Sequence, residues 1–477
     1  MTAENDTAPP PRAFRARFIV SQNEVLTNSL IETVGDRISR THSIADYPHP
    51  ERIEDLGEVA IIPGLVNAHS HSFQRIIRSA TEFVRYERRL DSFWTWRERM
   101  YEAATSLEPE DVYDVARVAF LEMLRTGITS VGEFHYIHHR PDGSTYADPN
   151  ELAMRVINAA RDTGIRICLL RVAYQRAGFE QKPNPRQARF IDRDVDHYLR
   201  QLETLETACR REPTATVGMA PHSIRAVSSD WISALLNTSF GARMPIHIHV
   251  CEQRKEIEES MAEYGLPPIL ALQESGLLGD MTTLVHATHL TDEEHESIRN
   301  SGASVCACPT TERNLGDGFL PARQLIRDQV PICLGSDSHQ QIDLWEDRRL
   351  VEYHERLRTE RRNVLAQEAG QNHRKEWEQI NTADILWTMG SSHGARALGL
   401  PSGNLAPGEL ADFVTVDLDH LSIAGTSKDN LISDLVFSAS SSSVRDTFVG
   451  GRPVIVNRIH ADADAILARY RQLRSRQ

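Results

Sequence analysis

The residues best suited to chemistry stand at the end of a short apolar run, Pro63-Gly64-Leu65-Val66-Asn67-Ala68-His69-Ser70-His71. Alternate residues of a strand point to the same side, so His69 and His71 can reach one point in space together. Two neutral imidazoles at this spacing are typical of a divalent transition metal site, most often a zinc site. Because the chain has 20 histidines, a chance pair on a surface turn is the competing interpretation of this motif taken alone.

Four further strand-like runs are followed by metal- or proton-active residues. His249 and Glu252 come at and after the end of Ile246–Val250, and the other three runs are followed by His222, His286 and Asp337. A single histidine at a strand end is more often structural than functional. Five strand ends of this kind favour one shared site.

A hydrolytic metal site needs three or four ligands, one open position for water and a proton shuttle. We expect nitrogen ligands from His69, His71 and His249, and an oxygen ligand from Asp337 that can also accept a proton. A second metal would usually need a bridging group, such as a modified lysine after the fourth strand. No lysine ends a candidate strand, so the sequence predicts one metal; the lysines are Lys182, Lys255, Lys375 and Lys428.

Two further residues are candidates for moving protons. Glu252 lies three residues past His249, off the strand, where its carboxyl group could deliver a proton to a leaving nitrogen. His286 could hydrogen-bond the attacking water or the developing tetrahedral centre.

Strand-then-helix units must position these groups. Eight apolar, β-branched runs are candidate strands: Leu65–Ala68, Ile128–Val131, Ile165–Val172, Thr214–Ala220, Pro245–Val250, Thr282–His286, Ala303–Cys308 and Pro331–Leu334. Helical patterns lie between several of them, the clearest over Glu110–Arg125, with Pro109 near its start and Gly127 after its end. The α/β class is therefore predicted, as a (β/α)8 TIM-type barrel over residues 63–400 with its chemistry at the carboxyl ends of the strands.

The chain ends predict a second, smaller unit. Residues 1–62 contain short β-like runs, and residues 401–477 contain a turn, further strands and a terminal helix at Ala461–Arg474. We expect the two parts to form one small β-sandwich domain. Within the barrel region, residues 345–378 and Thr382–Leu398 are each predicted to be helical, residues 173–195 form a polar loop, and the insertion 72–105 is either a lid or a dimer contact.

Composition narrows the function classes. Of 477 residues, 40% are hydrophobic and 25% charged, which is typical of a soluble globular protein, and the net charge of −14 disfavours nucleic acid or an anionic membrane as a partner. The N-terminal residues have no apolar core of a signal peptide, and no later run is long enough to span a membrane. The six cysteines lie mostly in apolar runs and predict reduced core residues, hence a cytoplasmic protein.

These motifs resemble the amidohydrolase superfamily, in its mononuclear deaminase branch, over residues 59 to 365. More narrowly, five segments resemble the N-formimino-L-glutamate deiminase (formimidoylglutamate deiminase) family of histidine degradation: His69-Ser70-His71-Ser72-Phe73-Gln74-Arg75, Phe93-Trp94-Thr95-Trp96-Arg97, Glu133-Phe134-His135-Tyr136, His222-Ser223-Ile224-Arg225-Ala226-Val227 and Asn314-Leu315-Gly316-Asp317-Gly318. The resemblance implies a homodimer with one Zn2+ per subunit. It implies ligands His69, His71, His249 and Asp337, and a proton-handling and polarising set of Glu252, His286 and Asp337.

The resemblance also implies a pocket for a small dicarboxylate, made by Gln74, Arg97, Tyr136, His222 and Arg225. Independent chemistry agrees, because two arginines and a tyrosine can hold the two carboxylates of a glutamyl group. The alternatives are packing of Arg97 on Trp94 or Trp96 and a surface salt bridge for Arg225. The implied reaction is hydrolytic deimination of N-formimino-L-glutamate to N-formyl-L-glutamate and ammonia.

Two rival functions remain open. A deaminase of the same branch would act on a purine or an adenosine derivative, although such a pocket would favour aromatic stacking and amide contacts over two arginines. A catalytically inactive barrel with a binding role would have lost ligands, whereas this chain keeps the full candidate set. The loop 78–92, with Arg78, Arg85, Arg88 and Arg89, does not align with the family pattern and could alter substrate preference.

Overall fold

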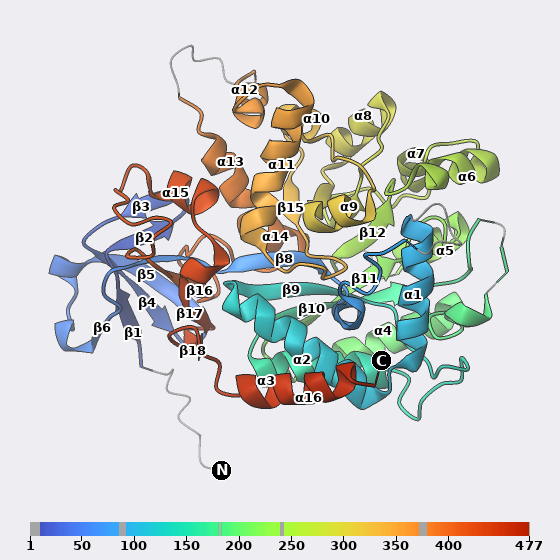
Figure 1. The fold of residues 1–477 in the computed structure, drawn as a ribbon, viewed down its shortest axis with the longest axis horizontal. Helices are drawn as coiled ribbons and strands as arrows, with labels where there is room; N and C mark the ends of the chain where they lie inside the picture. Colours follow the sequence, from blue (N-terminus) through green and yellow to red (C-terminus); the bar gives the residue numbers. More distant parts are fainter. Residues whose placement is uncertain are drawn as a thin grey trace.

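The computed structural model describes residues 10–84, 92–179, 181–182, 184–238, 243–371 and 379–476. Its central sheet has eight strands in the order β15-β14-β13-β12-β11-β10-β9-β8, each parallel to its neighbours (Figure 1). A parallel bridge between Ser70 and Asp337 joins the two edge strands at their carboxyl ends and closes the barrel there. The predicted barrel is thus confirmed, with all eight predicted strands in place: β8 (Leu65–Ser70), β9 (Ile128–His135), β10 (Arg166–Ala173), β11 (Ala215–Pro221), β12 (Ile246–Val250), β13 (Thr282–His286), β14 (Ser304–Ala307) and β15 (Ile332–Leu334).

Helices surround the barrel, and every residue of its strands except one is buried, as expected when both faces of a parallel sheet are covered. The predicted helix at Glu110–Arg125 is α2, with Pro109 at its first position. The helices of this layer are α2 (Pro109–Arg125), α3 (Glu151–Thr163), α4 (Val195–Cys209), α5 (Ser229–Leu236), α6 (Arg254–Tyr264), α7 (Pro268–Glu274), α8 (Asp292–Ser301), α9 (Pro309–Leu315), α10 (Ala322–Arg327), α11 (Leu344–Thr359), α12 (Val364–Gly370), α13 (Thr382–Met389) and α14 (Ser392–Ala397).

Two sheets at one end of the molecule are built from both ends of the chain (Figure 1). One has the order β5-β4-β1-β6 and the other β18-β17-β16-β7-β2-β3. The aromatic rings of Phe14, Phe413 and Phe448 pack between them, so the sheets form the predicted sandwich. The strands are β1 (Arg12–Arg15), β2 (Phe18–Ser21), β3 (Glu24–Leu26), β4 (Ser29–Val34), β5 (Arg37–Ser43), β6 (Ile53–Asp55), β7 (Val59–Pro63), β16 (Phe413–Asp417), β17 (Val444–Val449) and β18 (Arg452–Ile455).

The sandwich is joined to the barrel by short, buried connections. Gly64 alone separates β7 from β8, and its N–H donates to the carbonyl oxygen of Asp412 at 3.0 Å. The Asp412 carboxylate is fully buried and pairs with both Nε (2.7 Å) and Nη2 (3.1 Å) of Arg166, at the start of β10. The strand that carries His69 and leads to His71 is therefore held at its amino end by the sandwich.

The terminal helix α16 (Ala463–Arg474) lies along α2 (Figure 1), with α15 (Leu431–Phe437) preceding the last two strands. The Tyr470 hydroxyl donates to the carbonyl oxygen of Arg75 at 3.0 Å, in the 3-10 segment η3 (Ser72–Ile77) that follows β8. The insertion after β8 continues in α1 (Phe93–Ser106), whereas Arg85, Arg88 and Arg89 lie outside the described residues.

Two predicted helices are each divided in the structure. The helix predicted over Thr382–Leu398 breaks at Gly390, because the carbonyl oxygen of Gly390 accepts a hydrogen bond from Val66 N at 3.0 Å instead of continuing a helix. Within the described part of the helix predicted over 345–378, α11 ends at Thr359, before Glu360, whose φ of 53° is left-handed, and α12 begins after Asn363, with a φ of 52°. Residues 372–378 of that prediction lie outside the described residues. The carboxylate of Glu352 accepts the first N–H groups of α12, from Val364 and Leu365, both at 3.0 Å.

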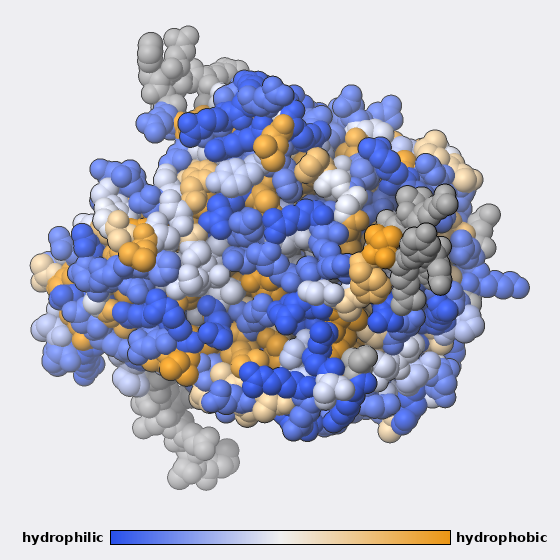
Figure 2. Space-filling model, viewed as in Figure 1, coloured by the Kyte–Doolittle hydropathy of each residue, from blue (hydrophilic) through white to orange (hydrophobic). Residues whose placement is uncertain are grey.

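The face of the molecule in Figure 2 is mostly hydrophilic, in keeping with the charged composition. All six cysteines are free and buried, as predicted. Among the described helices, none combines the length and the apolarity needed to cross a membrane.

Candidate metal centre and substrate pocket

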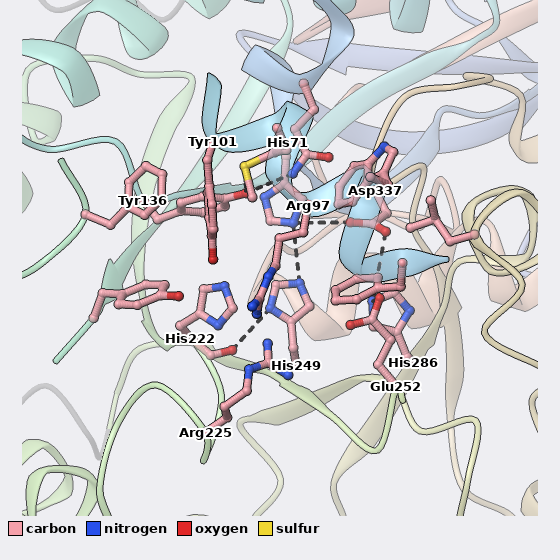
Figure 3. A pocket seen from close by; sticks show the side chains of 17 residues that line it. His71, Arg97, Tyr101, Tyr136, His222, Arg225, His249, Glu252, His286 and Asp337 are labelled. Atoms are coloured by element: carbon pink, nitrogen blue, oxygen red, sulfur yellow. Dashed lines mark hydrogen bonds and ion pairs between the residues drawn. The ribbon is translucent and has the colours of Figure 1, made fainter. Parts of the chain in front are cut away.

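Four predicted ligands meet at the carboxyl end of the barrel. The Nε2 atoms of His69, His71 and His249 lie 3.1 to 3.3 Å from one another. Asp337 Oδ1 is 3.3 Å from His69 Nε2. It is 3.2 Å from His71 Nε2, a contact that is visible in Figure 3. All four side chains are buried.

This donor set fits a metal ion. Ligand bonds of about 2.0 to 2.1 Å in a tetrahedron place donor atoms about 3.3 Å apart, which matches these separations. Backbone carbonyls fix two rings, because Nδ1 of His71 donates to Phe134 O (2.8 Å) and Nδ1 of His249 donates to His222 O (3.1 Å). The Nε2 lone pairs then face the centre, and three converging lone pairs need a cation between them.

Electrostatics favour the forms of these ligands that bind metal. Burial lowers the pKa of His69 to about 3 and that of His249 well below its ordinary value, so both rings are neutral. Burial opposes ionisation of Asp337, but the facing rings of His69 and His71 and the charge of His286 outweigh it and hold the pKa of that carboxyl well below its usual range. Neutral imidazoles with a carboxylate are typical zinc ligands.

Tight packing brings the ends of β8 and β15 together. A Cβ on Gly335 would lie 2.7 Å from the Cβ of His69 and 3.0 Å from its carbonyl oxygen, so only glycine fits there. The backbones of His286 (φ 73°) and Asp337 (φ 48°) are left-handed, a strained conformation that is common at functional sites.

A buried glutamate supports the loop that carries the first two ligands. Glu133, on β9, accepts hydrogen bonds from Ser70 Oγ (2.5 Å), Ser72 N (2.7 Å) and Ser72 Oγ (2.6 Å). Ser70 Oγ also contacts His339 Nε2 at 3.0 Å, two residues beyond Asp337. Burial raises the pKa of Glu133, against the effect of these hydrogen bonds. The segment around His71 is thereby fixed to the second strand.

The predicted proton-handling residues lie beside the ligand cluster. His286 Nε2 is 3.5 Å from Glu252 Oε1 and 3.9 Å from Asp337 Oδ2, and its Nδ1 is 3.4 Å from Glu312 Oε1. Burial disfavours the charged ring, but Glu252, Glu312 and Asp337 raise the pKa of His286 to about 10. Burial raises the pKa of Glu252, with His286 opposing it. The carboxyl group of Asp337, whose pKa is lowered, and that of Glu252, whose pKa is raised, thus both lie next to His286, as expected of a base and an acid in one site.

Glu312 was missed by the sequence reasoning. It lies in the first turn of α9, immediately after the seventh strand, and its carboxylate also accepts a hydrogen bond from Cys308 N at 2.8 Å. An acidic residue just beyond a strand end was the available signal.

All five predicted pocket residues line one cavity above the ligand cluster. It is bounded by Gln74, Arg97, Tyr136, His222 and Arg225 together with His71, His249, Glu252, His286, Asp337 and an apolar and aromatic wall of Phe93, Trp96, Met100, Tyr101, Tyr174, Phe190 and Leu315. In Figure 3 the side chains of Arg97 and Arg225 approach the same region, beside His222 and His249. Helix α1 therefore forms part of the cavity wall.

Arg97 and Arg225 are held in the cavity wall by different contacts. The Arg97 guanidinium lies 4.4 Å from the ring centre of Trp94, so the cation–π packing and the pocket position hold together. Arg225 is buried and pairs with Glu256 at 3.6 Å, so its salt bridge is not on the surface. Burial raises the pKa of Glu256 to about 7, with Arg225 opposing the shift.

The other pocket residues are neutral hydrogen-bonding groups. Gln74 Nε2 donates to Tyr136 Oη at 2.8 Å, and burial raises the pKa of Tyr136 well above its ordinary value. Burial, with the charge of Arg225, lowers the pKa of His222 well below its usual range. The pocket therefore presents two cations, an amide, a phenol and a neutral imidazole to a ligand.

Comparison with known proteins agrees with this geometry. The model of the amidohydrolase family matches residues 60–454. The chain belongs to the amidohydrolase family. It is 38% identical over 403 residues to the formimidoylglutamate deiminase of Pseudomonas aeruginosa, covering 84% of this chain and 86% of that protein.

Solved structures show the same architecture. An amidohydrolase from Brucella melitensis superimposes with a TM-score of 0.88 at 31% identity, over 98% of this chain and 99% of that one. An adenosine deaminase from Xanthomonas campestris with bound zinc gives 0.79 at 25% identity, over 98% and 99% of the two chains.

Proposed function

We propose that this chain hydrolyses N-formimino-L-glutamate to N-formyl-L-glutamate and ammonia. The observation that carries the proposal is one cavity with two arginines on its wall and the four-ligand cluster and acid–base groups at its floor. The 38% identity to a formimidoylglutamate deiminase supports the same substrate. The reaction is the deimination step of histidine degradation.

Carboxylate recognition falls to Arg97 and Arg225. Arginine binds a carboxylate through parallel N–H groups, and burial of Arg225 strengthens such contacts. Arg97 pairs with no carboxylate among the described residues, so its charge is available to the ligand. Gln74, Tyr136 and His222 add hydrogen bonds that orient the glutamyl chain, leaving the formimino carbon above the ligand cluster.

His69, His71, His249 and Asp337 would hold one zinc ion, which supplies Lewis-acid activation of water at neutral pH. Asp337 Oδ2 faces His286 and lies where it can accept the proton of the attacking water. Glu252 lines the cavity and can give its proton to the departing imine nitrogen. His286 donates a hydrogen bond to the oxygen that becomes the formyl oxygen.

The same proposal covers the zinc content, the oligomeric state and the cellular location of the protein. One zinc per subunit is proposed because the described residues bring together one cluster of four ligands. The second group of metal-binding residue types, His286, Cys308 and Asp337, has three members and shares Asp337 with the first. We propose a homodimer on the basis of the family resemblance, and a cytoplasmic location on the basis of the cysteine usage. Metal analysis and light scattering of the purified protein test the first two.

The deciding experiment is ammonia release by zinc-loaded protein from N-formimino-L-glutamate, with adenosine and guanine in parallel. We expect turnover of formiminoglutamate alone. Two variants in helix α1, Arg97→Met and Arg99→Met, test whether the cavity arginine binds the substrate. Arg97→Met removes a charge from the cavity, whereas Arg99→Met is the control, because Arg99 is exposed and pairs with Glu102. Turnover of a purine alone would overturn the role given to Arg97 and Arg225.

A further inference from the structure

Arg225 has a carboxylate behind it, on the side away from the cavity. Glu256 Oε2 lies 3.6 Å from Arg225 Nη1, and the two side chains are 1% and 5% exposed. Arg225 lines the cavity, whereas Glu256 does not. A ligand in the cavity therefore meets the guanidinium but not the carboxylate that faces its other side.

The two charges are matched to each other. Among the described residues, no side chain donates a hydrogen bond to the carboxylate of Glu256, and Nε and Nη1 of Arg225 have no hydrogen-bond acceptor. A buried cation without a countercharge is costly, and it would turn toward any available oxygen. In its ionised form, Glu256 compensates this charge while leaving N–H groups of Arg225 free for a ligand.

Helix α6, which carries Glu256, also fixes the backbone of Arg225. Arg176 donates from Nε to the carbonyl oxygen of Arg225 and from Nη2 to that of Ile224, both at 3.1 Å. Arg176 is in turn held by Glu263 (2.8 Å) and Tyr264 (3.0 Å), at the end of α6. Helix α6, which begins two residues after Glu252, therefore contacts Arg225 at its side chain and, through Arg176, at its main chain.

We propose that Glu256 is a positioning residue for substrate specificity: it holds the Arg225 guanidinium in the direction that binds a substrate carboxylate. This inference rests on the proposed function. Glu256 touches no reacting group, so its effect falls on binding that is equal in the ground and transition states, which changes KM and leaves kcat.

The test compares Glu256→Gln with Glu259→Gln in the zinc-loaded enzyme. Glu259 is on the same helix but pairs with the exposed Lys255, so it is a matched control. We expect KM for N-formimino-L-glutamate to rise about tenfold in the first variant, within the usual coupling between contacting side chains. We expect kcat, zinc content and the KM of the control to stay within about twofold of wild type.

A double-mutant cycle with Arg225→Lys tests whether the effect acts through Arg225. In that background Glu256→Gln should add little to KM. An unchanged or lower KM in the single variant, or an equal rise in both backgrounds, overturns the inference. If Glu256→Gln does not fold, Glu256→Asp keeps the charge but shortens the side chain, and its KM should rise while that of Glu259→Asp does not. Absence of wild-type turnover overturns the proposed function itself, which distinguishes the two failures.

Discussion

The hydrogen bonds between Glu133 and the segment Ser70–Ser72, which contains His71, give the most direct test of how the candidate metal site is supported. Replacing Glu133 by glutamine removes a charge that accepts three hydrogen bonds from Ser70 and Ser72. Glutamine keeps one acceptor oxygen and turns an NH2 group toward donors, so at least one buried donor loses its partner. Such a loss costs about 1 to 3 kcal/mol.

That cost falls on the segment that carries His71. Because Glu133 places the segment that carries His71, we expect its loss to weaken zinc binding by about 10- to 100-fold, the usual effect of changing the outer partners of metal ligands. The assay is equilibrium competition for zinc with a chelator of known affinity, at fixed pH. Glu122→Gln is the control, because Glu122 pairs with Arg75 beyond the ligands and is partly exposed.

A Glu133→Gln protein that binds zinc within about twofold of wild type would refute the reasoning. The segment Ser70–Ser72 would then be fixed by the backbone contacts of β8 and β15 alone. A loss of thermal stability in the metal-free protein without a change in zinc affinity would have the same meaning.

Three further predictions follow from contacts already described. Glu252→Gln should lower kcat/KM by about 10² to 10⁴ while zinc content stays unchanged, since Glu252 is not among the four ligands; loss of zinc would contradict this separation. Asp412→Asn should lower the free energy of unfolding by about 3 to 5 kcal/mol, because it leaves Arg166 buried and unpaired. The control Asp417→Asn breaks an exposed pair and should cost under about 1 kcal/mol in the same urea titration. Dithionitrobenzoate should titrate few thiols in the native protein and all six after unfolding, because every cysteine is buried; rapid native labelling would show an open core.

The barrel could be predicted because its strands are buried on both faces and therefore form short, largely apolar runs, such as Ile332–Leu334. The ligand positions could be predicted for a related reason. A polar residue directly after such a run must stand at the carboxyl end of the barrel, where His249 and Asp337 meet β8.

The supporting carboxylates could not be predicted, because their partners are distant in sequence. Glu133 lies in a buried strand that also contains Thr129, Ser130 and His135, and its donors are about 60 residues earlier. Glu256 resembles any acid of a charged helix until the fold places Arg225 beside it. The break at Gly390 also depends on tertiary structure, since the competing donor is Val66.

The connection between β7 and β8 also affects how the chain folds during synthesis, because one partner of β7 is made much later. Strand β7 pairs with β2 on one side, but its other partner is β16, with Pro63 opposite Phe413. About 350 residues must leave the ribosome before that edge is covered, and an open strand edge invites wrong pairing. A nascent chain that already holds all four candidate ligands therefore still lacks β16. Strand β7, which leads through Gly64 into the strand of His69, keeps an open edge until residues 413–417 have been made.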